Sequence, residues 1–386
     1  MLLEFWTMIS ADRPATRLAT RLAFLVAGFG VACWAPLIPY AKARLAVDDG
    51  VLGLLLLCLG IGSVVAMPMT GMLSARYGSK PIVIGGAIGM AIVLPLLAVA
   101  STPLMLGATL FLFGGSLGSL DVAMNIHAVE VEKAAKRPLM SGFHGLFSVG
   151  GFIGSMFATF LLSVQIGPLP TMLVAAALML AATLVIAPRL LTTVKADGGP
   201  LFAVPRGFVL LLAVLTAIVF LVEGAVLDWG ALFLTGQGLA GAEQGGMAYM
   251  VFSIAMTVMR LTGDAVVGRI GDRATLFWGG LIGIVGFVLV LTAPIVAVAM
   301  AGFLLVGIGL ANTVPVLFRR AGNQSIMPAG LAVAAVTTMG YAGMLVGPAG
   351  IGFVAQLTSL PASLWMLTAL LLLVTLTAGR VAGRPH

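Results

Sequence analysis

Long apolar runs separated by short polar breaks fill this chain from about residue 18 to residue 380. Each run is long enough to cross a hydrocarbon core of about 30 Å as a helix, which takes roughly 20 mostly apolar residues. Breaks of proline, glycine and charge predict twelve spans, at residues 18–40, 51–74, 81–101, 104–129, 139–163, 169–190, 207–235, 245–268, 275–293, 295–318, 329–356 and 361–380.

Composition supports a membrane protein. Hydrophobic residues make up 61% of the chain and charged residues 9%, and the mean hydropathy is +1.17. Soluble domains contain about 45–50% apolar and about 25% charged residues, so a soluble fold is excluded. A β-barrel would show short alternating segments, whereas these runs are continuous. We therefore expect an all-α membrane protein.

The distribution of Lys and Arg predicts the orientation. With the N-terminus on the cytoplasmic side, seventeen basic residues lie in cytoplasmic segments and only Lys42 and Arg44 lie outside. Positive residues are retained in the cytoplasm during insertion, so both termini are expected there. The formal charge of +7 is thus a topology signal. The basic residues are scattered between the apolar runs and form no cluster, so we expect no nucleic-acid partner.

The chain also repeats itself. A shift of 193 residues lays the segment 76–80 onto 269–273, and Gly154 and Ser155 onto Gly347 and Pro348. The repeat predicts two pseudo-symmetric six-helix bundles, residues 1–190 and 207–386, joined by a cytoplasmic linker at 191–206. Parallel six-span repeats are typical of one class of secondary transporter.

The loop after the second span resembles that of the major facilitator superfamily. The family motif reads Gly-x-Leu-x-Asp-Arg-x-Gly-Arg/Lys-Lys/Arg, and this chain has Gly71, Leu73, Arg76, Gly78 and Lys80. Ala75 stands where the family usually has an acid that latches the two halves. The resemblance implies a gating role for this loop, with a latch that is either weak or carried by Asp264 and Asp272 of the second copy.

A narrower resemblance points to the fucose permease-like group and its YbjJ/MosC-like branch. It rests on the segments 118–125 and 141–151, on Glu223-Gly224, and on Asp228-Trp229. The resemblance implies twelve helices of the superfamily fold and transport of a small polar, sugar-like solute. It also implies that Asp121, which matches the acid of the fucose permease motif, serves proton coupling.

Intramembrane acids are functional candidates because a charge at the bilayer centre costs roughly 2.5–3.5 kcal/mol even on insertion scales. Asp121 lies near the middle of the fourth span. Its alternative role is a structural hydrogen bond. Asn125, one turn later, either binds a hydroxylated solute or holds the Asp121 carboxyl.

Histidine titrates near physiological pH, so His144 is a proton-coupling candidate, and His127 a weaker one. Each is otherwise a packing residue. Glu223 and Asp228 lie about 140° apart around the seventh span, so they cannot both face one cavity. Glu223, deeper in its run, is the expected coupling acid. Asp228 lies toward the outer end and is assigned to substrate binding.

The remaining site candidates are polar or aromatic residues on other spans. Trp34 either stacks on a sugar ring or anchors the interface, and Asn312 is assigned to the substrate group. Arg260 and Asp264, four residues apart on the eighth span, are expected to form a gating pair. An anionic substrate bound to Arg260 is the alternative. Arg269, in the second copy of the loop motif, completes the gating set.

The chain shows no metal-ligand spacing, phosphate loop or activated nucleophile, so we expect neither an enzyme nor a cofactor. The favoured mechanism is alternating access with proton symport, by a monomer in a bacterial inner membrane. Its expected partners are a small solute, protons and the lipid bilayer. Proton-driven efflux is the main alternative, although the fifth span lacks the Gly-Pro of drug antiporters. A membrane receptor that transports no solute is the third alternative.

Overall fold

A computed structural model describes residues 13–47, 49–192, 204–240 and 247–383, and every regular element in these ranges is helical. The first group of helices comprises α2 (Pro14–Trp34), η1 (Ala35–Leu37), α3 (Ile38–Leu45), α4 (Asp49–Tyr77), α5 (Ser79–Val99), α6 (Pro103–Ala135), α7 (Met140–Ser163), α8 (Pro168–Ile186) and η2 (Ala187–Arg189). The second comprises α9 (Gly207–Gly236), α10 (Met247–Leu291), α11 (Val296–Leu310), α12 (Thr313–Asn323), α13 (Ala329–Leu357) and α14 (Leu360–Ala382).

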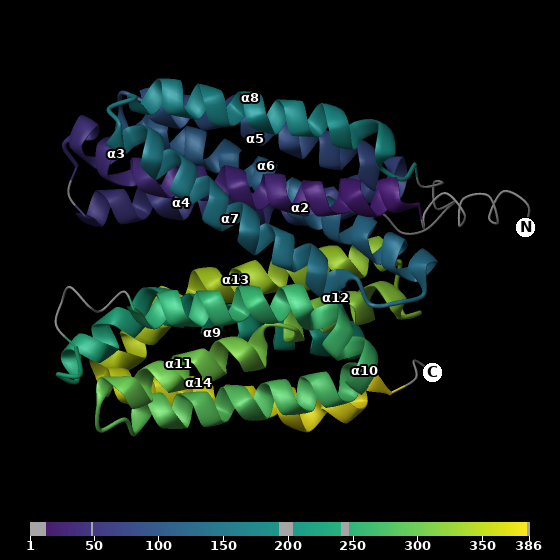
Figure 1. Cartoon of the computed structure of the whole chain (residues 1–386), viewed down its shortest axis with the longest axis vertical. Helices are drawn as coiled ribbons and strands as arrows, with labels where there is room; N and C mark the ends of the chain where they lie inside the picture. Colours follow the sequence, from purple (N-terminus) through teal and green to yellow (C-terminus); the bar gives the residue numbers. More distant parts are fainter. Residues whose placement is uncertain (1–12, 48, 193–203, 241–246, 384–386) are drawn as a thin grey trace, which may run out of the picture. The chain divides into compact units, whose positions relative to one another are not determined.

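The twelve predicted spans are confirmed. The described residues form eleven helical segments long and apolar enough to cross a membrane. One of them, α10, is 45 residues long and contains two spans, because Gly271 interrupts it with φ 77° and ψ 169°. Figure 1 traces the long helices along the chain. Boundaries differ by several residues, and α6 continues to Ala135, six residues beyond the predicted end.

The helices form two compact units, and each unit includes one short segment from the other half of the sequence. The first unit holds residues 1–137, 146–204 and 327–335, and the second holds 138–145, 205–326 and 336–386. The first turns of α7 therefore pack in the second unit, and those of α13 pack in the first. The predicted linker lies largely outside the described residues, so the division at residues 190 and 207 stays a prediction.

Two glycines confirm the sequence repeat in the backbone. Gly78, between α4 and α5, has φ 84°, and Gly271, 193 residues later, has φ 77°. A side chain is unfavourable at positive φ, because its Cβ crowds the following carbonyl group. Each glycine makes the tight turn between the second and third spans of its half. The two loop motifs thus share one backbone conformation.

Glycine also sets the distance between helices, and at equivalent places in the two units. Gly114 of α6 lies directly against the carbonyl of Leu59 on α4, with no room for a Cβ. Gly307 of α11 lies in the same way against the carbonyl of Phe252 on α10. Both pairs are related by the shift of 193 residues. Small residues permit such close backbone approach between membrane helices.

Arg44 is one of the two basic residues on the side predicted to be external, and its contacts explain why a charged residue stands there. Its guanidinium donates hydrogen bonds to the carbonyls of Leu97, Ala98 and Ala100, at 2.9, 2.6 and 2.9 Å. The last carbonyl groups of a helix have no partner within that helix. Arg44 satisfies those at the end of α5, which gives this residue a structural role.

We predict that Gly271→Ala destabilises the protein by about 1–2 kcal/mol, because alanine is strained at this positive φ. Gly85→Ala is the matched control, since nothing lies within 4 Å of a Cβ built there. Gly85 lies inside α5, where alanine is expected to be neutral or stabilising. Thermal unfolding in detergent measures both. Equal stability of Gly271→Ala and the natural protein would contradict the role given to this turn.

Candidate functional site

Asp121 and Asn125 form a buried polar pair in α6. Thr102 begins this helix by accepting a hydrogen bond from the Met105 amide, and Pro103 occupies its first turn. Asp121 lies near the middle of the helix and is 8% exposed, while Asn125 is fully buried. The Asn125 Nδ2 donates to Asp121 Oδ1 at 3.3 Å and to the Asp121 carbonyl at 2.9 Å. The Asn125 amide therefore contacts the Asp121 carboxyl, and the substrate-binding assignment of Asn125 stays a prediction.

His127, two residues further on, is engaged at both ring nitrogens. The Leu191 amide donates to Nε2 at 2.9 Å, and Nδ1 lies 3.2 Å from the Thr20 hydroxyl. Thr20 donates its own proton to the Thr16 carbonyl at 2.9 Å, so it accepts from Nδ1. This assigns the proton of the neutral ring to Nδ1. These contacts support the packing role of His127. Through them His127 connects α6 to the segment after α8.

In the second unit, Glu223 of α9 pairs with Arg260 of α10. The Arg260 Nη2 lies 3.0 Å from Glu223 Oε1, and the side chains are 11% and 21% exposed. Both residues lie near the middle of their spans. Burying either charge alone would be costly, and pairing offsets that cost. Glu223 is therefore held by an interaction that its position in the sequence does not reveal.

Arg260 also fills a gap in the tenth span. Residues 311 and 312 separate α11 from α12, so this span is interrupted near its middle. Pro315 has no N–H to offer the carbonyl four residues earlier, which is that of Ala311. Arg260 Nε donates to the Ala311 carbonyl at 3.2 Å. One guanidinium thus binds both a carboxylate and a carbonyl at the break.

Asn312 sits at the break and fits there because residue 263 is glycine. Its Nδ2 donates to the Met259 carbonyl at 3.3 Å. Its Oδ1 faces Gly263, where any Cβ would collide with it. Asn312 is only 4% exposed, and its Oδ1 has no hydrogen-bond partner among the described residues. The substrate-binding assignment of Asn312 stays a prediction.

The first turn of α7 lies against α10. The Gly142 amide donates to Asp264 Oδ2 at 3.0 Å. The first amides of a helix have no partner within that helix, and its dipole favours a negative charge there. His144 packs edge-on against Phe318 of α12, with ring centroids 5.6 Å apart. The predicted Arg260–Asp264 pair stays a prediction, since the contacts described for these residues are to Glu223 and Gly142.

The predicted gating residues lie around the two glycine turns. Gly71 is buried in α4, and a Cβ on it would come within 2.6 Å of Ala334 Cβ on α13. Arg76 is exposed in the last turn of α4, Lys80 is half-buried in the first turn of α5, and Arg269 is exposed before Gly271.

Asp272, the acid of the second loop, binds two arginines of α12 in its own unit. Its carboxylate oxygens lie 2.8 Å from Arg319 Nη2 and 2.7 Å from Arg320 Nε. Arg320 also donates to the Ala382 carbonyl at the end of α14. These contacts fix α12 and α14 to the turn after the eighth span.

Two further candidates differ in their surroundings. Trp34 ends α2 with 4% exposure, and its indole Nε1 has no hydrogen-bond partner within the described ranges. Such burial does not favour an interfacial anchor. Asp228 is exposed toward the end of α9, five residues beyond Glu223.

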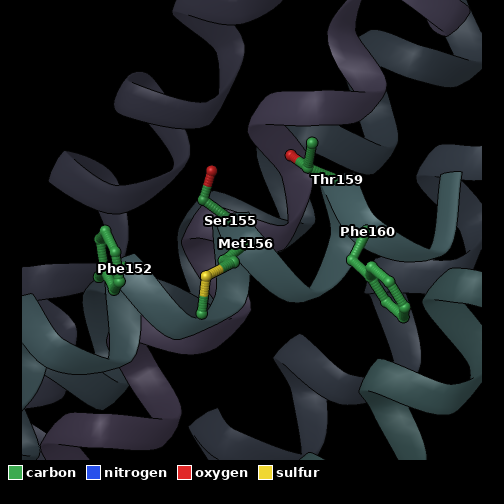
Figure 2. A pocket seen from close by; sticks show the side chains of 5 residues that line it. All are labelled: Phe152, Ser155, Met156, Thr159 and Phe160. Atoms are coloured by element: carbon green, nitrogen blue, oxygen red, sulfur yellow. The ribbon is translucent and has the colours of Figure 1, made fainter. Parts of the chain in front are cut away.

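A shallow groove on α7 contains none of these acids. It is lined by Phe152, Ser155, Met156, Thr159 and Phe160. In Figure 2, the hydroxyls of Ser155 and Thr159 point away from Phe152, Met156 and Phe160. The groove therefore consists of one helix face with an apolar row and offers no charged group to a ligand.

The tenth-span break was missed by sequence reasoning, although one signal was present. Pro315 lies four residues after Ala311, and a proline inside a helix releases the carbonyl at that spacing. The Arg260–Glu223 pair was missed because its members are 37 residues apart. Only packing of α9 on α10 brings them together.

Twelve spans in two repeats, with ionisable residues at mid-depth, define a multi-span membrane transporter. The model of the Major Facilitator Superfamily matches residues 21–324. The chain belongs to this superfamily, whose members are transporters and not enzymes.

The similar proteins agree with this assignment. An uncharacterized MFS-type transporter of Yersinia pestis is 46% identical over 366 residues, covering 95% of each chain. The membrane protein MosC of Rhizobium meliloti is 29% identical and covers 92% of this chain and 88% of its own. The E. coli fucose:proton symporter FucP superposes with a TM-score of 0.73 at 14% identity, over 97% of this chain and 100% of FucP. That likeness shows the fold alone.

A double-mutant cycle tests the Glu223–Arg260 pair. Removing one partner of a buried ion pair costs about 3–5 kcal/mol, because the other charge is left uncompensated. We predict that Glu223→Gln and Arg260→Gln each lower stability by an amount of this order. The double variant is expected to lose less than the sum of the two, measured by unfolding in detergent. Additive losses would show that the pair contributes nothing as a pair.

Proposed function

We propose that this transporter is a proton-coupled symporter of a small polar solute. The observation that carries the proposal is the buried Asp121 carboxyl at mid-length of α6, held by Asn125. Acids at this depth in membrane proteins mark ion pathways and proton relays. Glu223 in the second unit is the other acid assigned to coupling, and His144 the third titratable group.

The chemistry follows from the cost of charge in a medium that lacks water. A carboxylate is much more costly to bury than the neutral carboxyl group. Asp121 therefore takes up a proton from the side with the higher proton concentration and releases it where water next reaches it. Moving one charge across 100 mV supplies about 2.3 kcal/mol, which suffices to concentrate a solute. Alternating access by the two halves links the two movements.

The other residues are assigned by position. Asn125, Trp34, Asp228 and Asn312 are the proposed solute contacts. Gating is assigned to Gly71, Arg76, Gly78, Lys80, Arg260, Asp264 and Arg269. We place the protein in a bacterial inner membrane as a monomer, with both termini in the cytoplasm.

The comparisons support the class and leave the solute open. FucP is described as a fucose:proton symporter, and its fold is similar to this one. At 14% identity the likeness does not transfer fucose to this chain. A hydroxylated solute agrees with the Asn312 amide, whose Oδ1 can accept a hydrogen bond.

We predict that Asp121→Asn keeps the fold and abolishes proton-driven uptake. The amide has the shape of the carboxyl but cannot exchange a proton. The measurement uses proteoliposomes with an inward proton gradient, a panel of sugars, inositols and sugar acids, and a pH dye inside. Glu130→Gln, in the last turns of the same helix, is the control and is expected to retain coupling.

Two outcomes would overturn the symport proposal. Uptake at the natural rate and with natural pH dependence by Asp121→Asn would remove the coupling role of this acid. Expulsion of the solute against an inward proton flow would show that the natural protein is an antiporter.

A further inference from the structure

The break in the tenth span assembles an arrangement that the proposed symport does not itself require. Arg260 holds the Ala311 carbonyl and the Glu223 carboxylate at once, both within the second unit. The break adds Asn312, whose buried Oδ1 has no hydrogen-bond partner among the described residues. Interrupted membrane helices are the usual place for substrate and ion sites in transporters. The guanidinium is thus positioned by backbone at a break and carries an exchangeable anion.

Glu223 is the exchangeable member of the pair. A carboxylate can take up a proton, whereas a guanidinium stays charged in proteins. The bond from Arg260 to Ala311 does not involve Glu223, and it holds the guanidinium in place when the carboxylate is neutralised. Protonated Glu223 would leave a positive charge near the centre of the membrane, which is costly unless another anion compensates it.

We propose that the solute carries an anionic group, such as a carboxylate, which replaces protonated Glu223 on Arg260. This inference rests on the proposed symport and names the substrate class. The guanidinium binds a carboxylate through two parallel N–H groups. The Asn312 Oδ1 accepts a hydrogen bond from a hydroxyl of the solute. Sugar acids and other hydroxy acids combine both groups. The exchange leaves the net charge at Arg260 unchanged.

Other ionisable groups of the described residues lie near this pair. Asp264 lies one turn after Arg260 on α10 and accepts from the Gly142 amide. Tyr249 of α10 lies within electrostatic reach of both Glu223 and Arg260, and Asp228 lies further along α9. His144 of α7 lies within reach of Arg260. Tyr341 of α13 packs edge-on against Phe220 of α9, one turn before Glu223. Neither α11 nor α14 has a charged residue at this depth, and α12 carries its arginines at its far end. Glu223 contacts the guanidinium directly, with Oε1 3.0 Å from Nη2.

The test measures ligand-induced stabilisation of the full-length protein in detergent. The probes are matched neutral and acidic compounds: galactose and galacturonate, glucose and gluconate, glycerol and glycerate, propylene glycol and lactate. At least one acid is expected to raise the Tm saturably while its neutral partner does not. Binding to the natural protein should weaken as pH rises, because Glu223 must be protonated. Glu223→Gln should bind the acid at pH 8 at least about tenfold more tightly than the natural protein, and without pH dependence.

Arg260→Gln should abolish the acid-specific stabilisation, and Arg260→Lys should retain part of it. Arg380→Gln, which removes an exposed arginine from the end of α14, is the matched control and should bind as the natural protein does. The proposal is overturned if neutral partners stabilise equally, if Arg260→Gln still binds acid, or if no acid stabilises Glu223→Gln. Binding is measured without a gradient, so this result is independent of whether Asp121 couples transport to protons.

Discussion

The ion pair between Glu223 and Arg260 is the interaction on which the account of this site depends. Neither charge is tolerable alone near the centre of a membrane, and replacing one partner of such a pair typically costs about 3–5 kcal/mol. The same guanidinium satisfies the Ala311 carbonyl that Pro315 leaves without a donor. One side chain therefore stabilises both the charge of α9 and the break in the tenth span. Neutralising Glu223 removes the charge partner of Arg260, while the bond from Arg260 to Ala311 keeps the guanidinium at the break.

The two repeats have the same backbone but different chemistry. Gly78 and Gly271 make the same turn, and Gly114 and Gly307 make the same close helix contact. At the functional positions the halves differ: Met67 stands at the position equivalent to Arg260, and Val314 at that equivalent to Asp121. The two repeats therefore carry different ionisable groups at equivalent positions.

Much of the fold could be predicted from the sequence, because spans and turns depend on local properties. Apolar length gave twelve spans, and the repeated Gly78 and Gly271 marked the turns. The acids Asp121 and Glu223 were found because charge is rare in such runs. The partner of Asp121 was predictable, because Asn125 lies one turn away on the same helix. The partner of Glu223 was not, because Arg260 meets it only through helix packing. His127 is a candidate because histidine titrates near physiological pH, but its bonds to Thr20 and Leu191 depend on the tertiary fold. The identity of the solute depends on the geometry of the side chains in the site, which the periodicity of the sequence does not reveal.

The most direct test of the central claim is the number of protons taken up when an acid binds. The purified protein is mixed with the stabilising acid at about pH 7.5 in weakly buffered solution containing a pH indicator. If the acid replaces a protonated Glu223 on Arg260, the natural protein takes up about one proton per acid bound, while Glu223→Gln takes up none. Binding of the acid without proton uptake by the natural protein, or equal uptake by Glu223→Gln, would contradict the account.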